Sequence, residues 1–296
     1  MLAKLFRKKK SVLDCKVSIV IQPTSVTVAV ISTDVSNVKQ LPCPDQNYAN
    51  TIANLAQEQD VAGATCYIVL AHGMYQVAQI DKPNVPESEY SKVLGFSAKD
   101  YFTIPVENQL LDHYQNVSNN TNNKLNVVAC DRTIILPILA ALREINVELI
   151  GISIVDIVLT HFVKEEQANL IIFHNPGSQL LLGIIKNGQL CFSRHIHGYD
   201  NLHQLSEIDF EAGVLNNLGL EVQRSIDYAI GQLKLESVAN IYVSVQNFDS
   251  GCIVSSLQEF FDIKVSILSS FDNEDFVRFP MNFAALQEIN MDVPSS

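Results

Sequence analysis

The chain has 296 residues, of which 47% are hydrophobic and 18% are charged. That balance is typical of a globular protein and excludes an intrinsically disordered one, and the length is sufficient for two domains that each bury a core. The formal net charge of −12 argues against nucleic acid as a partner, because phosphate binding needs a basic surface. The longest apolar stretches, Ile134–Leu142 and Leu149–Leu159, are far shorter than the roughly 20 residues that cross a bilayer, so no membrane-spanning helix is expected.

The first ten residues are basic although the whole chain is acidic. They contain no acid and five cations, Lys4, Arg7, Lys8, Lys9 and Lys10. Leu2, Leu5 and Phe6 fall on one helical face beside these cations, which is the pattern of a small interfacial anchor on an anionic membrane. A frayed N-terminus accounts for the same residues equally well, because one helical turn is marginal alone. Since no apolar core region of a signal peptide follows, we expect a cytoplasmic protein in peripheral contact with a membrane.

Apolar alternation and β-branched runs predict strands along the whole chain. In chain order these are Lys16–Ile21, Val26–Ile31, Cys66–Ala71, Tyr75–Ile80, Leu125–Cys130, Glu148–Ile154, Asn169–His174, Leu180–Ile185, Leu190–Ile196, Asn240–Val245 and Lys264–Leu268. Helical spacing predicts helices over 45–60, 86–96, 132–145, 210–234 and 253–261. Pro137 lies inside the third of these, so that helix is expected to start late or to kink. Strands mixed with helices in this order indicate an α/β or α+β fold.

The same order of predicted strands and helices occurs twice in the sequence. Residues 17–40 predict three strands joined by turns and lead to a helix, and residues 169–197 do the same. The first turns match, with Gln22-Pro23-Thr24-Ser25 in one copy and Asn175-Pro176-Gly177-Ser178 in the other. A further strand follows each helix, so the sequence predicts two βββαβ units; two unrelated hairpins are the weaker interpretation.

Two such units with turns at these positions resemble the actin-like fold, whose RNase H-like halves hold a nucleotide between their first hairpin turns. The segment 75–154 begins YQVAQIDKPNVPESEYSKVLGF and ends NVVACDRTIILPILAALREINVELIGISI. It resembles the subdomain inserted in the PilM-like proteins of type IV pilus assembly, and residues 192–196 and 220–228 are also similar to that family. The resemblance implies an α/β, actin-like fold. Its parts would be a basic tail at 1–14, a first half at 15–165 with the insert at about 72–149, and a second half at 166–296.

The turns differ from those of active members of the family, in which an Asp positions Mg²⁺ and small residues hold the phosphates. The corresponding positions here are Gln22, Thr24, Ser25, Asn175, Gly177 and Ser178. Gln22 and Asn175 are neutral amides, and Pro23 and Pro176 have no N–H to donate. The glycine pair expected after Val245 is absent as well, since residues 246–251 read QNFDSG. We therefore expect a degenerate nucleotide site with no catalytic residue and no required cofactor, so that ATP and Mg²⁺ are not needed.

The resemblance implies a scaffold at the inner membrane that binds the cytoplasmic tail of a bitopic, PilN-like assembly protein and contacts the pilus motor ATPase. The tail would dock near 45–60 and 85–97. The alternative is an actin-like ATPase of the same machinery, which the missing Asp at both turns disfavours.

A metal-dependent hydrolase on an RNase H-like core is disfavoured because carboxylates do not cluster at the strand ends. No metal site is expected either: His195 and His197 share a strand, but no third ligand is nearby. The six cysteines form no Cys-x-x-Cys pair and are expected to be buried thiols.

Overall fold

The computed structural model describes residues 15–31, 36–59, 61–116, 123–246, 250–268 and 278–291. The predicted basic tail lies outside these ranges. The chain forms two compact units, and each unit is assembled from separated stretches of sequence. Unit 1 consists of Met1–Met74, Arg132–Ser153 and Met281–Ser296, and unit 2 consists of Tyr75–Asp131 and Ile154–Pro280. Within the described ranges, no helix is long and apolar enough to cross a membrane.

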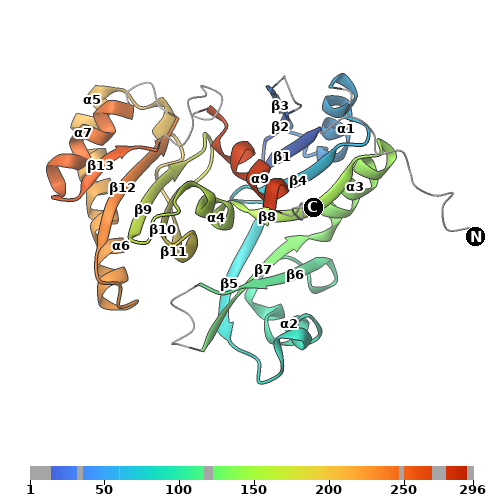
Figure 1. Cartoon of the computed structure of the whole chain (residues 1–296), viewed down its shortest axis with the longest axis horizontal. Helices are drawn as coiled ribbons and strands as arrows, with labels where there is room; N and C mark the ends of the chain where they lie inside the picture. The colour runs from blue at the N-terminus through green and yellow to red at the C-terminus, as the bar shows by residue number, and fades with distance from the viewer. Residues whose placement is uncertain are drawn as a thin grey trace, which may run out of the picture. The chain divides into compact units, whose positions relative to one another are not determined.

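Unit 1 is built on a five-stranded sheet with the order β3-β2-β1-β4-β8. Its elements are β1 (Lys16–Gln22), β2 (Ser25–Ile31), β3 (Ser36–Pro42), α1 (Tyr48–Glu58), β4 (Thr65–Leu70), α3 (Arg132–Glu144), β8 (Glu148–Ile154) and α9 (Pro280–Met291). The first three strands form an antiparallel meander, and β4 joins β1 in parallel, as a strand reached through a helical crossover does. Figure 1 shows these elements in the blue to green part of the chain, together with the red helix α9.

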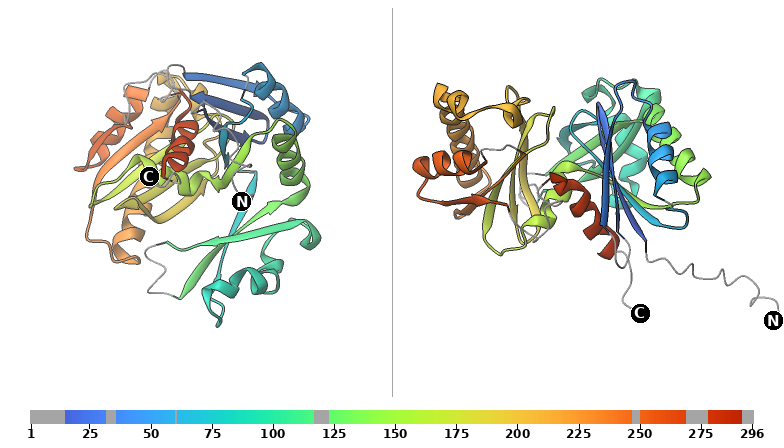
Figure 2. Two further views of the ribbon diagram at one scale, coloured as in Figure 1. Left: turned by 45° about the vertical axis from the view of Figure 1, so that its right-hand side comes forward. Right: turned by 90° about the horizontal axis from the view of Figure 1, so that it is seen from above.

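Helices cover both faces of this sheet. α1 and α3 lie on one face and α9 lies on the other (Figure 2). Strand β1 is therefore buried on both sides, which explains its continuous apolar sequence. Ser18 is the polar exception inside β1, and its hydroxyl and carbonyl oxygens both lie 3.2 Å from the Asn282 Nδ2 donor of α9. The buried amide of α9 thus has hydrogen-bond partners in β1.

Unit 2 contains two sheets, with the orders β5-β7-β6 and β11-β10-β9-β12-β13. Its strands are β5 (Tyr75–Asp81), β6 (Gln109–Tyr114), β7 (Lys124–Asp131), β9 (Ala168–His174), β10 (Leu180–Lys186), β11 (Gln189–Ile196), β12 (Val238–Val245) and β13 (Lys264–Ile267). Its helices are α2 (Tyr90–Ser97), α4 (Val155–Val158), α5 (Glu207–Asp209), α6 (Leu215–Gly231) and α7 (Ser250–Phe260). Short 3₁₀ turns at Glu87–Glu89, Lys99–Tyr101, Val106–Asn108, Leu159–Phe162 and Leu202–Gln204 connect them.

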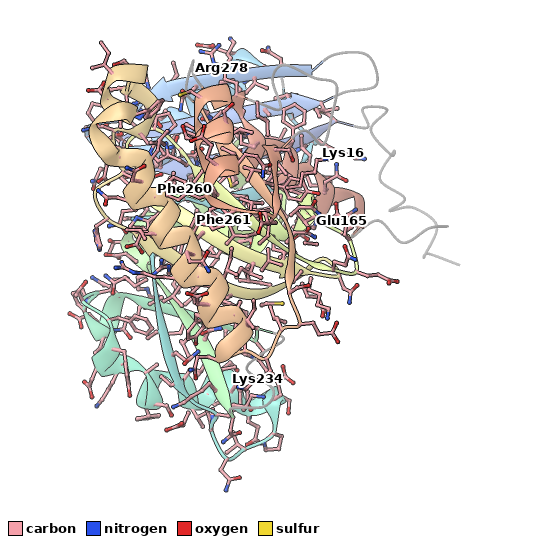
Figure 3. All side chains as sticks on the ribbon, turned by 90° about the vertical axis from the view of Figure 1, so that its left-hand side faces the viewer. Lys16, Glu165, Lys234, Phe260, Phe261 and Arg278 are labelled. Atoms are coloured by element: carbon pink, nitrogen blue, oxygen red, sulfur yellow. The ribbon has the colours of Figure 1, made fainter. Side chains whose placement is uncertain are left out.

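Each sheet of unit 2 has its own core. α2 packs against the three-stranded sheet through Tyr90 and Leu94, and α6 and α7 pack on the five-stranded sheet. Figure 3 looks onto α6 and α7, with Lys234 just beyond the end of α6 and Phe260 at the end of α7. The two helices approach closely where a Cβ on Gly219 would lie 3.2 Å from the Phe260 ring. A larger residue at 219 would push this ring away.

The observed elements follow the predicted ones, with differences in several places. Each predicted strand is present, and the βββαβ order occurs in both repeats. Of the two outcomes expected for the helix containing Pro137, a late start does not occur, because α3 begins at Arg132 with Pro137 inside it. The predicted helix 210–234 is interrupted at Gly213, whose φ is +100°, so that α6 begins only at Leu215. Helix α9 was not predicted at all.

The compact units also differ from the predicted sequence boundaries. The expected halves, 15–165 and 166–296, are continuous, whereas the units are interleaved. Strands β5, β6 and β7 interrupt the first sheet in sequence, between β4 and β8, yet they cluster with the second repeat. The expected insert at about 72–149 includes α3, but α3 packs against α1 in unit 1.

Candidate functional site: the first turn of each repeat

The first turn connects β1 to β2. The last paired residues are Gln22 and Ser25, so Pro23 and Thr24 form a two-residue hairpin loop. The Gln22 side chain is buried, and its Oε1 accepts hydrogen bonds from Ser25 Oγ at 2.9 Å and from Gln40 Nε2 at 3.2 Å. The Ser25 hydroxyl, which in the resembling family faces a phosphate, therefore donates to a neighbouring side chain instead.

Other segments hold the backbone of this turn in place. Tyr48 Oη donates to the Pro23 carbonyl at 2.9 Å, and the Cys43 N–H donates to the Thr24 carbonyl at 2.7 Å. Burial, and secondarily Cys43, raises the pKa of Tyr48, so this hydroxyl remains a neutral donor. Gly73 has a φ of +93°, and a Cβ there would lie 2.8 Å from Pro23 Cγ. Only glycine fits both this backbone and this space.

The second turn connects β9 to β10. The Asn175 carbonyl accepts hydrogen bonds from the Ser178 N–H at 3.1 Å and from Ser178 Oγ at 2.8 Å. Pro176 and Gly177 occupy the two central positions, and the φ of Gly177 is +74°, as a type II turn requires. Asn175, Gly177 and Ser178 thus build the turn itself, and the Ser178 hydroxyl donates within it.

Two histidines that sequence reasoning missed support the second turn. His174 is 1% exposed, its Nε2 lies 3.3 Å from the Asp200 carbonyl, and its ring stacks on His203 at 5.6 Å. Burial, with a smaller effect from His203, lowers the pKa of His174 to about 4. The imidazole is therefore neutral at pH 7 and supplies no positive charge to an anion at this turn. A single His at the end of an apolar strand gave no sequence signal for this role.

The remaining residues considered in the sequence are those of the third nucleotide element, two histidines and the cysteines. Residues 247–249 of the third nucleotide element lie outside the described residues, between the end of β12 and the start of α7. His195 and His197 have different partners: His195 Nε2 lies 3.3 Å from Asp156 Oδ2, and His197 Nδ1 lies 2.6 Å from Gln179 Nε2. No cluster of three or more metal-ligating side chains occurs in the part of the chain that the structure describes. None of the six cysteines, all of which lie within the described ranges, forms a disulfide, and four of them are buried.

Comparison with known proteins shows the fold. No protein-family model matches the chain, and no curated protein matches it. A solved PilM–PilN type IV pilus biogenesis complex matches at a TM-score of 0.64 and 14% identity, over 93% of this chain and 97% of that one. The cytoplasmic domain of EpsL, from the type II secretion system of Vibrio cholerae, matches at 0.52 and 10% identity, over 92% and 95%. A Bacteroides thetaiotaomicron protein with an actin-like ATPase fold matches at 0.54 and 11% identity, over 91% and 96%. The chain therefore has the actin-like α/β fold, as its two βββαβ repeats predict.

Proposed function

We propose that this chain is a non-catalytic scaffold of a type IV pilus assembly machine, of the MSHA type to which the protein MshI belongs. It would bind the cytoplasmic tail of a bitopic, PilN-like protein of the inner membrane and contact the pilus motor ATPase. The observation that carries this proposal is the similarity over nearly the full length of both chains to a protein solved as a PilM–PilN complex. The basic tail, with Lys4, Arg7 and Lys8 to Lys10, would add peripheral membrane contact from the cytoplasmic side.

The α2 region of unit 2 has the surface that a docking partner needs. Three large apolar side chains are exposed there: Phe96 on α2 at 81%, Tyr101 at 62% and Val106 at 56%. All three belong to the segment between β5 and β6, and Phe96 lies within the predicted docking region 85–97. Exposed aromatic side chains of this kind are typical of the central residues of protein interfaces. This surface supports binding of a polypeptide rather than turnover of a small substrate.

The partner is tested by purifying a tagged full chain from detergent-solubilised membranes and quantifying the PilN-like protein that accompanies it. We expect the double variant Phe96→Ala, Tyr101→Ala to lower recovery of that protein at least tenfold, because truncating a central aromatic residue commonly costs ~2 kcal/mol or more. The matched control is Ile208→Ala, which truncates an equally exposed apolar residue on α5 and should leave recovery unchanged.

A second variant separates protein recruitment from lipid recruitment. Deleting residues 1–10 should lower sedimentation with anionic vesicles while the PilN-like protein is still recovered. If no PilN-like protein accompanies the unaltered chain, the scaffold proposal is wrong. If the aromatic double variant and Ile208→Ala recover it equally, docking does not involve the α2 region.

Nucleotide binding separates the scaffold from the alternative, an actin-like ATPase. Gln22 and Asn175 supply no anion for Mg²⁺, and the Ser25 and Ser178 hydroxyls already donate inside their turns. Each lost charge-assisted contact weakens binding by ~1.5–3 kcal/mol, so millimolar Mg·ATP should leave the melting temperature unchanged and no phosphate should be released. A Mg²⁺-dependent rise in melting temperature with ATP that is abolished by Thr24→Ala and Ser178→Ala would favour the ATPase instead.

A further inference from the structure

Unit 2 contains a cavity of about 320 Å³ that includes none of the turn residues. One wall belongs to the three-stranded sheet, with Val77 on β5 and Tyr114 at the end of β6. The opposite wall belongs to β11 and to the end of α6, where the Phe192 and Tyr228 rings pack 4.9 Å apart. Apolar and aromatic side chains therefore form part of the walls, beside several polar ones, and the volume suits a small molecule or one side chain of a partner.

Two buried amides of the lining are unsatisfied. Asn126 on β7 is 5% exposed and Asn116 is 9% exposed. Asn126 Oδ1 accepts from Gln79 Nε2 at 3.4 Å, which leaves its Nδ2 as the unused donor. Among the described residues, neither Asn126 Nδ2 nor Asn116 Oδ1 has a hydrogen-bond partner. Buried polar atoms are nearly always paired, so a donor and an acceptor left open in one cavity lining indicate a missing partner.

The one acid among the described residues of the cavity lining already has hydrogen-bond donors inside the protein. Asp156 is 2% exposed, and its carboxylate accepts hydrogen bonds from Tyr75 Oη and from His195 Nε2. Burial alone would raise the pKa of Asp156, but the hydrogen bond and charge of His195, followed by hydrogen bonds from Tyr75 and Ser193, hold it below its usual value. The carboxylate is thus ionised and supplied with donors. None of the described lining residues is Lys or Arg. An anionic ligand finds no counter-charge there, and an uncharged ligand suits the site best.

We propose that this cavity binds an uncharged carboxamide or peptide group that carries a small apolar or aromatic moiety. An amide offers its carbonyl to Asn126 Nδ2 and its N–H to Asn116 Oδ1, and so pairs both open atoms with one planar group. The apolar moiety then lies against Val77, Phe192 and Tyr228. The amide can belong to a free small molecule or to an Asn or Gln side chain of a partner polypeptide.

The test uses the ¹⁵N-labelled full chain and follows the side-chain NH₂ resonances of Asn116 and Asn126 by NMR. Titration with benzamide should move both resonances in a saturable way, with a Kd of about 1–10 mM for so small a probe. Benzoate has the same shape but is anionic and has no donor, and it should move neither resonance. A glutamine flanked by acetyl and methylamide groups is the second probe. Tighter binding of this probe than of benzamide identifies a partner polypeptide as the source of the amide, and weaker binding identifies a small molecule.

Three variants test whether benzamide binding depends on the cavity. Asn126→Asp keeps the acceptor used by Gln79 but loses the Nδ2 donor, so it should weaken benzamide binding at least tenfold. Asn217→Asp makes the same change at an exposed position of α6 and should bind normally. If Asn126→Asp fails to fold, Val77→Phe fills the cavity from a residue that is 42% exposed and should abolish binding while the melting temperature is kept. Absence of a saturable shift, equal binding of benzoate, or full binding by these cavity variants overturns the proposal, and the cavity then holds water only.

Discussion

Replacing Asp156 with alanine will lower the free energy of unfolding by about 3–5 kcal/mol, as removal of one partner from a buried charged network does. The carboxylate lies on α4 and is 2% exposed. It accepts hydrogen bonds from Tyr75 on β5 and from His195 on β11, so one side chain connects the three-stranded sheet with the five-stranded sheet inside unit 2. The alanine variant removes the carboxylate that these two buried groups share as an acceptor. Urea denaturation at pH 7 measures the loss.

The matched control is Asp112→Ala on β6. The Asp112 side chain is 92% exposed, and removal of an exposed carboxylate changes the free energy of unfolding by at most about 0.5 kcal/mol. Asp156→Asn keeps one oxygen acceptor in place and should lie between the two variants. Equal stability of the Asp156 and Asp112 alanine variants would show that the network contributes nothing to the fold.

The free energy of unfolding will also fall by about 3 kcal/mol between pH 7 and pH 4 because of His174. Its pKa is about 4 in the folded chain, against an ordinary value of 6.5. Below pH 6.5 the unfolded chain binds a proton that the folded chain does not bind, so stability declines as the pH falls through this range. The gap of about 2.5 pH units corresponds to about 3.4 kcal/mol in full, of which about 3 kcal/mol is lost by pH 4 and the rest below it.

Denaturation of the His174→Gln variant at several pH values isolates this contribution. Glutamine does not titrate, so the stability of the variant should depend less on pH than that of the unaltered chain, by about 3 kcal/mol over this range. His197→Gln replaces an exposed histidine and should keep the full pH dependence. A His174→Gln variant with an unchanged pH dependence would mean that the imidazole binds its proton at the same pH in the folded and the unfolded chain.

The strands and the repeat could be predicted because they depend on local patterns. β1 and β9 are mostly apolar because both of their faces are buried, and the turn after each strand contains Pro. Helix α9 could not be predicted for the opposite reason. Met281, Phe283 to Leu286 and Ile289 are all buried and lie around the helix rather than along one face, so no amphipathic stripe marks it in the sequence.

The side-chain clusters could not be predicted because they join residues that are distant in sequence. Tyr75 and His195 are separated by 120 positions, and each lies at an ordinary place in a predicted strand. Asp156 interrupts an apolar run, which is a signal of a buried or functional acid, but the sequence does not show which donors it meets. Tyr48 likewise occupies an apolar position of its helix, and only its contact with Pro23 shows that it holds the first turn.

The position of α9 has a consequence for the synthesis of this chain. The Asn282 amide binds Ser18 across 264 positions of sequence, and α9 covers a face of the sheet that contains β1 and β2. That face stays open to water, and to chaperones, while the ribosome translates the 248 residues between β2 and α9. Folding of unit 1 therefore finishes after the polypeptide of unit 2 has emerged, and a nascent chain truncated before Pro280 exposes an apolar sheet face that invites aggregation.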